Sequence, residues 1–294
     1  MLKNVFCSTN IFIKLIVRAV VVVVVLLFAI RGVAQQQTDT VSVDQTENSV
    51  FKFTDMSIVE TFKTGIDVVT SPFQKWNNTK IYNTILLFGS TSFSYFFIDE
   101  ICKDFIDDNI SESGKRFGKT VSEFGNPVFV GSTVLGLGAA GLISKNSQLS
   151  RTTYLSAQSF IISMTLCYVT KHLSGRLRPD YSTNNDMWYG PNWQENHKRS
   201  FYSGHTTALF SVATVFALEY KDVSWVPPVL YLFAGSISVS RIIAGDHWMS
   251  DVVFAAGISH LVARKVVNRY HKSEGKYTVV PFFSNKEMGL IVKF

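Results

Sequence analysis

The sequence predicts an all-α protein, a membrane-embedded bundle of about six core helices with a short C-terminal β-hairpin. Hydrophobic residues make up 47% of the 294 residues and charged residues only 17%, which is more apolar than an ordinary soluble enzyme. From about residue 51, apolar segments alternate with short polar joints. No alternating strand pattern appears before the C-terminal tail, so the body of the chain is expected to be helical.

The first 34 residues have the layout of a secretory signal. Basic residues precede an apolar run from Ala19 to Ile30, and small residues follow at positions 32–34. Arg31 flanks the run, so a signal peptide and an uncleaved signal anchor both remain open. In either case the following segment is expected outside the cytoplasm. Residues 35–75 are interpreted as a polar linker and a peripheral segment.

The remaining chain divides into a bundle, residues 76–272, and a tail, residues 273–294. Asn126-Pro127 and Pro227-Pro228 are typical of helix starts. Two β-prone runs around Ser284-Asn285-Lys286 predict the terminal hairpin. The apolar segments, from the linker onward, predict helices near 54–70, 81–107, 127–144, 151–174, 204–220, 226–243 and 248–270.

Residues 127–144, 153–170 and 223–240 each carry at most one charge and approach the length of a membrane span. A compact soluble domain is the alternative. If the chain is outside at residue 35, an even number of crossings must precede residue 171. Hydroxyl residues interrupt 81–98, and an acidic stretch follows it. We therefore expect 81–98 to lie in the interface without crossing fully.

Basic residues mark one end of the expected bundle. The joints at 145–151, at 219–222 and after 263 carry lysines and arginines, and this end is cytoplasmic by the positive-inside tendency. Loop 171–203 and turn 241–250 then lie on the extracytoplasmic face. The net charge of +6 is scattered along the chain, which suits anionic substrates and lipids better than nucleic acid. The three cysteines give no disulfide framework and no zinc-ligand spacing.

Two short motifs place polar groups where the helices otherwise avoid them. In "KHLSGRLRP", Lys171 and Arg178 are nearly two helical turns apart, so both cations can lie along one face. In "SFYSGHTTALF", Ser203, Gly204 and His205 directly precede an apolar helix. The unpaired backbone N–H groups at such a helix start attract an anion. Alone, each motif fits an ordinary helix end as well as a functional site.

The third motif is "SRIIAGDHWMSD", residues 240–251. His247 and Asp251 are one helical turn apart, so the carboxylate can accept a hydrogen bond from one ring nitrogen and leave the other as a nucleophile or base. Arg241 supplies a fork of donors that matches phosphate oxygens. Asp246 is interpreted as a loop residue that could also tune His247.

Together the three motifs resemble the type 2 phosphatidic acid phosphatase family, which includes class A acid phosphatases and vanadium-dependent haloperoxidases. The resemblance spans about residues 150–265. One departure is Tyr202, where the family usually has proline before Ser-Gly-His. The positions in register are Lys171, Arg178, Pro179, Ser203, Gly204, His205, Ser240, Arg241, His247 and Asp251.

The resemblance implies a role for each motif residue. Lys171, Arg178 and Arg241 would hold the phosphoryl group, with help from the Ser203 hydroxyl and the Gly204 amide. His247 would attack phosphorus with its ring oriented by Asp251, forming a phosphohistidine. His205 would protonate the leaving alcohol and then help to activate water. No metal and no other cofactor is implied. His172, His197, His260 and His271 match no motif position and are interpreted as structural.

The function expected from these residues is that of a metal-independent phosphatase of a bacterial inner membrane, with its site facing the periplasm. Implied substrates are phosphatidate, phosphatidylglycerol phosphate, polyprenyl diphosphate and the phosphates of lipid A. The alternatives are a soluble periplasmic acid phosphatase, a vanadium-dependent haloperoxidase and a scaffold without activity. The expected partners are the membrane and a phosphorylated lipid, with neither nucleic acid nor an obligate protein partner.

Overall fold

The computed structural model describes residues 58–71, 74, 76–274, 278–283 and 288–293. The expected signal and most of the linker lie outside these residues. The described elements are α2 (Ile58–Thr70), α3 (Asn78–Phe93), a π-helical turn (Ser94–Ile98), α4 (Asp99–Asn109), α5 (Glu112–Ser122), α6 (Pro127–Ile143), α7 (Ser147–Ser174), α8 (Gly204–Glu219), α9 (Val226–Ile243), α10 (Met249–Glu274), β1 (Thr278–Phe283) and β2 (Met288–Lys293).

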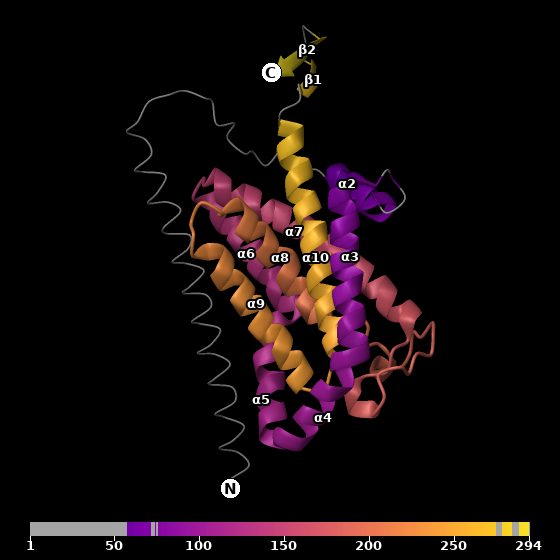
Figure 1. The fold of residues 1–294 in the computed structure, drawn as a ribbon. Helices are drawn as coiled ribbons and strands as arrows, with labels where there is room; N and C mark the ends of the chain where they lie inside the picture. The colour runs from indigo at the N-terminus through magenta and orange to yellow at the C-terminus, as the bar shows by residue number, and fades with distance from the viewer. Residues whose placement is uncertain (1–57, 72–73, 75, 275–277, 284–287, 294) are drawn as a thin grey trace.

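The prediction of a helical bundle is confirmed. Helix α8 lies at its centre and packs against α6, α7, α9 and α10 (Figure 1). Ala208, Leu209 and Ala213 on α8 pack with residues of α6 and α9, and Val215 packs with residues of α7 and α10. The C-terminal hairpin is also present, because β1 and β2 pair antiparallel with Thr278 opposite Lys293. Burial of α8 on several sides fixes its first turn deep within the molecule.

The helix expected over 81–107 is present as one helical stretch, Asn78–Asn109, in which a π-helical turn at Ser94–Ile98 joins α3 to α4. The helix that follows this stretch, α5, was not expected. Ser111 starts α5, because its hydroxyl accepts a hydrogen bond from the backbone N–H of Gly114 at 3.3 Å. Figure 1 shows α4 and α5 as a V at the lower end of the bundle.

Three helical stretches are long and apolar enough to cross a membrane: Asn78–Asn109, Glu112–Ile143 and Val226–Ile243. The first of these includes 81–98, which we expected to lie in the interface, and it is long and apolar enough to cross. The hydroxyls of Ser90 and Thr91 do not interrupt the helix, because they donate to the carbonyl oxygens of Leu86 and Leu87 within it at 2.6 and 2.7 Å. Residues 153–170, expected to cross, lie in α7, which is not among the three stretches.

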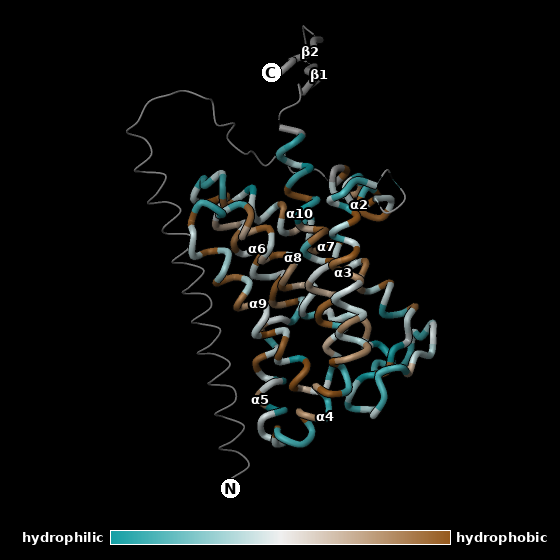
Figure 2. Tube along the Cα trace, in the orientation of Figure 1, coloured by the Kyte–Doolittle hydropathy of each residue, from teal (hydrophilic) through white to brown (hydrophobic). Residues whose placement is uncertain are grey.

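Helix α7 falls short because serine and threonine lower its hydropathy, yet these residues are buried inside the bundle. Small hydroxyl side chains permit close packing of helices, and Ser156, Ser159 and Ser163 are each at most 2% exposed. Figure 2 shows the wider pattern, with apolar residues along the helices and hydrophilic residues concentrated in the connections at the lower right.

The two ends of the bundle differ as the charge pattern predicts. At the upper end in Figure 1, Glu219 on α8 accepts from Arg151 Nε on α7 at 2.8 Å and lies 2.7 Å from His271 Nε2 on α10. The joints that carry basic residues therefore meet there. The connection between α7 and α8 and the turn between α9 and α10 lie toward the opposite end.

The motif residues lie near helix ends, and capping residues fix where these helices begin and end. The Ser203 side chain caps α8, and Asn126, followed by Pro127, caps α6. Gly175 ends α7 with a φ of 62°, and a Cβ at this position would overlap the backbone of Gly190. Only glycine fits this turn without strain. The chain thus leaves α7 directly after Lys171 and returns to start α8 at Ser203.

Candidate active site

Lys171, in the last turn of α7, meets the start of α8. Its Nζ donates to the carbonyl oxygens of Arg199 at 2.8 Å and Ser200 at 3.2 Å. A Cβ at Gly204 would lie 3.8 Å from Lys171 Cε. The first two motifs therefore lie in contact, with a cation beside the backbone N–H groups that open α8.

Arg178 and Arg241 converge on one carboxylate. Arg178 Nη1 lies 2.7 Å from Asp246 Oδ1, and Arg241 Nη2 lies 2.9 Å from Asp246 Oδ2. Arg241 also donates to the Ser122 hydroxyl at 2.8 Å. The Nε atom of each arginine is buried without a hydrogen-bond partner among the described residues. Buried donors of this kind are uncommon, and they leave both guanidinium groups able to bind an oxyanion.

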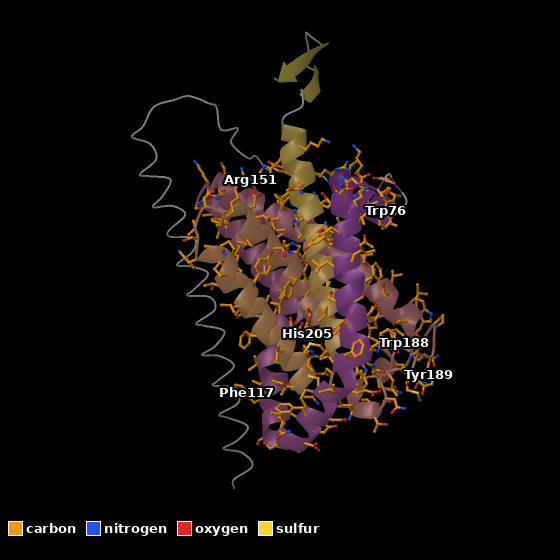
Figure 3. The ribbon with its side chains drawn as sticks, viewed as in Figure 1. Trp76, Phe117, Arg151, Trp188, Tyr189 and His205 are labelled. Atoms are coloured by element: carbon orange, nitrogen blue, oxygen red, sulfur yellow. The ribbon has the colours of Figure 1, made fainter. Side chains whose placement is uncertain are left out.

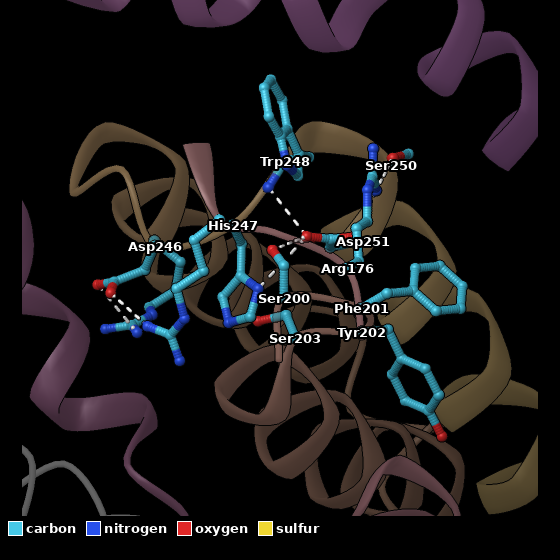
Figure 4. A network of polar contacts seen from close by, with 12 residues as sticks. Arg176, Ser200, Phe201, Tyr202, Ser203, Asp246, His247, Trp248, Ser250 and Asp251 are labelled. Atoms are coloured by element: carbon cyan, nitrogen blue, oxygen red, sulfur yellow. Dashed lines mark hydrogen bonds and ion pairs between the residues drawn. The ribbon is translucent and has the colours of Figure 1, made fainter. Parts of the chain in front are cut away.

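His247 and Asp251 face each other as their spacing predicts. The His247 Nδ1 atom lies 3.5 Å from Asp251 Oδ2, a contact in which Nδ1 forms no hydrogen bond with the described residues, and both side chains are almost fully buried. The same oxygen of Asp251 accepts from the Ser200 hydroxyl at 2.5 Å and from the Trp248 backbone N–H at 3.0 Å (Figure 4). Because Nδ1 faces the carboxylate, Nε2 is the ring nitrogen available for chemistry.

Burial favours the neutral form of the His247 ring. Burial lowers the pKa of His247 well below its ordinary value, and the positive charge of Lys171 adds to the effect. A neutral ring keeps the lone pair that a nucleophile needs. Figure 4 shows His247 between the Asp246 carboxylate on one side and Ser200 and Asp251 on the other.

His205 lies on the first turn of α8, in the interior of the bundle's lower half (Figure 3). Burial lowers the pKa of His205 to about 3, and the positive charges of Arg241 and Lys171 add to the effect. A phosphate dianion bound among these cations would offset their charge and raise the pKa of His205. Anion binding would therefore favour proton uptake by His205.

Ser203 and Gly204, expected to help hold phosphate, lie at the start of α8. The Ser203 hydroxyl accepts from the Thr206 hydroxyl at 3.0 Å and, more weakly, from the Thr206 N–H at 3.4 Å. The Ser203 N–H donates to the carbonyl oxygen of Asp251 at 3.3 Å, which ties the second motif to the third. Figure 4 shows the Ser203 side chain next to the His247 ring.

A second buried network behind Asp251 was missed by the sequence analysis. Arg176 Nη1 lies 2.6 Å from Asp251 Oδ1, and Arg176 Nη2 lies 2.7 Å from Asp99 Oδ2. All three side chains are fully buried. Ser250 joins them, because its hydroxyl and its backbone N–H both donate to Asp99. Two sequence features could have indicated this network. Asp99 is an acid at the end of an apolar run, and Arg176 is an additional arginine inside the first motif.

The histidines outside the motifs take part in other contacts. His172 stacks on Trp193 and lies 3.1 Å from Arg199 Nη1. His197 pairs with Glu195, His260 contacts Thr214 and Tyr231, and His271 pairs with Glu219. Tyr202, at the position that departs from the family pattern, is buried against Cys167 and Ala255. Its aromatic ring also packs on Phe254.

Comparison with known families agrees with this geometry. Residues 154–274 match the sequence profile of the PAP2 superfamily. This segment belongs to the PAP2 superfamily. The match includes every motif residue, from Lys171 to Asp251, and confirms the resemblance found in the sequence. The PAP2 segment contributes α7, α8, α9 and α10, whereas Asp99 and Ser122 reach the site from helices that precede it.

A curated relative is the lipid A 1-phosphatase of Porphyromonas gingivalis, which is 38% identical over 93 residues. The match covers 31% of this chain and 18% of that protein. The chain also resembles two solved structures. One is the transmembrane PAP2 type phosphatidylglycerolphosphate phosphatase from Bacillus subtilis, with a TM-score of 0.45, 15% identity, and coverage of 73% of this chain and 96% of that chain. The other is Aquifex aeolicus LpxE, with a TM-score of 0.43, 20% identity, and coverage of 59% and 96%.

Proposed function

We propose that this chain is a metal-independent phosphatase that hydrolyses a phosphomonoester or diphosphate group on a membrane lipid through a phosphohistidine at His247. One observation carries the proposal. Lys171, Arg178 and Arg241, from separate helix ends, gather beside His205 and His247, and the two arginines keep buried N–H donors that no described residue accepts from. Fixed cations of this kind stabilise the charge on a transferring phosphoryl group.

The proposed chemistry proceeds in two steps. His247 Nε2 attacks phosphorus, an N–P bond forms, and the P–O bond to the lipid alcohol breaks as His205 gives its proton to the leaving oxygen. His205 then takes a proton from water, whose oxygen attacks phosphorus. The N–P bond breaks, phosphate is released, and neutral His247 is restored. Asp251 holds Nδ1 throughout and stabilises positive charge on the ring.

Two features support a lipid as the substrate. The three apolar stretches suit a membrane protein, and the relative from Porphyromonas gingivalis is named for action on lipid A. In addition, a groove of about 930 Å³ runs between α2, α3 and α10. Its apolar wall includes Leu87, Phe88 and Phe254, and Phe254 packs on Phe201 and Tyr202 just before Ser203. Acyl chains lying along this wall would bring a phosphate close to the cations.

The site is proposed to face the periplasm, because basic residues lie in and next to the joints at the other end of the bundle. Lys145 and Lys221 lie in these joints, Arg151 lies on the first turns of α7, and Arg264, Lys265 and Arg269 lie on the C-terminal part of α10. By the positive-inside tendency that end lies in the cytoplasm of a bacterial inner membrane. Loop 171–203 and the turn before α10 are then outside.

A phosphate-release panel on the detergent-solubilised full chain tests the function. We expect turnover of at least one lipid among phosphatidate, phosphatidylglycerol phosphate, polyprenyl diphosphate and lipid A, in excess of turnover of para-nitrophenyl phosphate. EDTA should leave the rate unchanged, and vanadate should inhibit it. Faster turnover of the small ester would favour a general acid phosphatase. Halide oxidation that requires vanadate, without phosphate release, would replace the proposal with a haloperoxidase. The same panel on right-side-out vesicles tests the orientation.

A further inference from the structure

The turn between α9 and α10 directs an acidic side chain between the two arginines of the site. Gly245 takes a φ of 70°, and a Cβ there would overlap the carboxylate of Asp180. The next residue, Asp246, donates its backbone N–H to the Arg241 carbonyl oxygen at 3.1 Å. These constraints hold the backbone of Asp246 beside Arg241. Its side chain is directed away from Asp251, toward the two guanidinium groups (Figure 4).

Asp246 uses only part of what the arginines offer. One oxygen binds Arg178 Nη1 and the other binds Arg241 Nη2, whereas a guanidinium group can present two parallel N–H donors to an oxyanion. The Nε donors of both arginines stay buried and without partners among the described residues. An incoming phosphate can therefore bind these Nε donors while Asp246 keeps its contacts with one Nη atom of each arginine.

The carboxylate also sets the charge of the site. Lys171, Arg178 and Arg241 contribute three positive charges, and Asp246 removes one of them. Arg176 is shared by Asp251 and Asp99 behind the site, so it adds no free cation for a bound anion. Asp246 therefore lowers the positive charge that Arg178 and Arg241 present to a bound phosphate.

We propose that Asp246 is a positioning residue that shares Arg178 and Arg241 with the bound phosphate. It lowers the affinity of the two arginines for phosphate, so that the phosphate product is released. The inference rests on the proposed phosphatase function and adds a control on product affinity. Interactions that bind product and transition state equally well do not raise the rate of turnover. A carboxylate that competes with phosphate for the arginines limits such uniform binding. Because Asp246 directly precedes His247, this competition takes place next to the nucleophile.

Replacing Asp246 with asparagine tests the inference. Calorimetry on the solubilised full chain measures the Kd for inorganic phosphate, and steady-state assays measure product inhibition. We expect Asp246→Asn to bind phosphate about tenfold more tightly, with a lower KM and a lower kcat. Asp246→Glu keeps the charge and should keep a phosphate Kd close to that of the wild type, and the thermal midpoint of each variant reports its folding.

Asp180→Asn is the matched control, because Asp180 lies against the same turn and its salt bridge is to Lys119, not to either arginine. It should leave the phosphate Kd unchanged. If a folded Asp246→Asn protein binds phosphate no more tightly than the wild type, or more weakly, the inference is overturned. If the wild type binds phosphate but hydrolyses no ester, the proposed function fails while the effect of Asp246 on binding remains measurable.

Discussion

His247→Ala is expected to abolish phosphate release, lowering kcat by a factor on the order of 10⁴. The substitution removes the nitrogen that attacks phosphorus but leaves the three cations in place. Phosphate binding should therefore survive, and calorimetry on the variant should give a Kd within about threefold of the wild-type value. Loss of turnover with retained binding separates a reacting group from one that only holds the substrate.

His271→Ala is the control for this experiment. It makes the same chemical change at the opposite end of the bundle, where His271 pairs with Glu219, and it should retain wild-type kcat. Turnover by purified His247→Ala at more than a tenth of the wild-type rate would show that another residue attacks phosphorus.

Arg176→Met is expected to cost about 3–5 kcal/mol of folding stability, the largest effect on stability that we predict. The methionine side chain fills similar space but leaves Asp99 and Asp251 buried without their shared cation. Unpaired buried carboxylates are costly, so the variant should unfold at a much lower temperature in detergent, as followed by intrinsic tryptophan fluorescence. Residual folded protein should also turn over slowly, because Asp251 loses a contact that positions it.

A second substitution distinguishes this account from a simple packing defect. Adding Asp99→Asn to Arg176→Met removes one of the two uncompensated charges and should recover part of the lost thermal midpoint. Arg116→Met, at an exposed position on α5, should leave the midpoint near that of the wild type. The single variant Asp99→Asn completes the comparison. If Asp99→Asn lowers stability as much in the Arg176→Met protein as it does in the wild type, the two side chains are not coupled in the way the structure indicates.

The motif residues could be predicted because each lies at a helix end that local sequence defines. Ser203 caps α8, Pro179 follows Arg178, and the one-turn spacing of His247 and Asp251 holds in α10 and the turn before it. Local patterns of this kind depend on neighbours in sequence. The family resemblance then indicated that the helix ends converge, and the structure brings Lys171, Arg178, Arg241 and both histidines together.

The contacts that could not be predicted depend on distant pairs. Asp99 and Arg176 are 77 residues apart, and no local pattern shows that α4 returns to the site. Ser122 reaches Arg241 from α5, a mostly polar helix that the sequence analysis did not predict. Asp246 was interpreted as a loop residue that could tune His247, and the turn at Gly245 directs its side chain to the two arginines. The hydroxyl residues of α3 were interpreted as interruptions because their bonds to carbonyl oxygens of the same helix are not visible in sequence.

The account depends most on a covalent bond between phosphorus and His247. Full-length protein is mixed with a ³²P-labelled lipid substrate identified by the panel, quenched in alkaline denaturant within milliseconds, and digested for peptide mapping. We predict a label that is stable to alkali and released by acid, located in the peptide that contains His247, and absent from His247→Ala. Label on a different residue, or rapid turnover of the wild type with no labelled peptide at any quench time, would contradict the account.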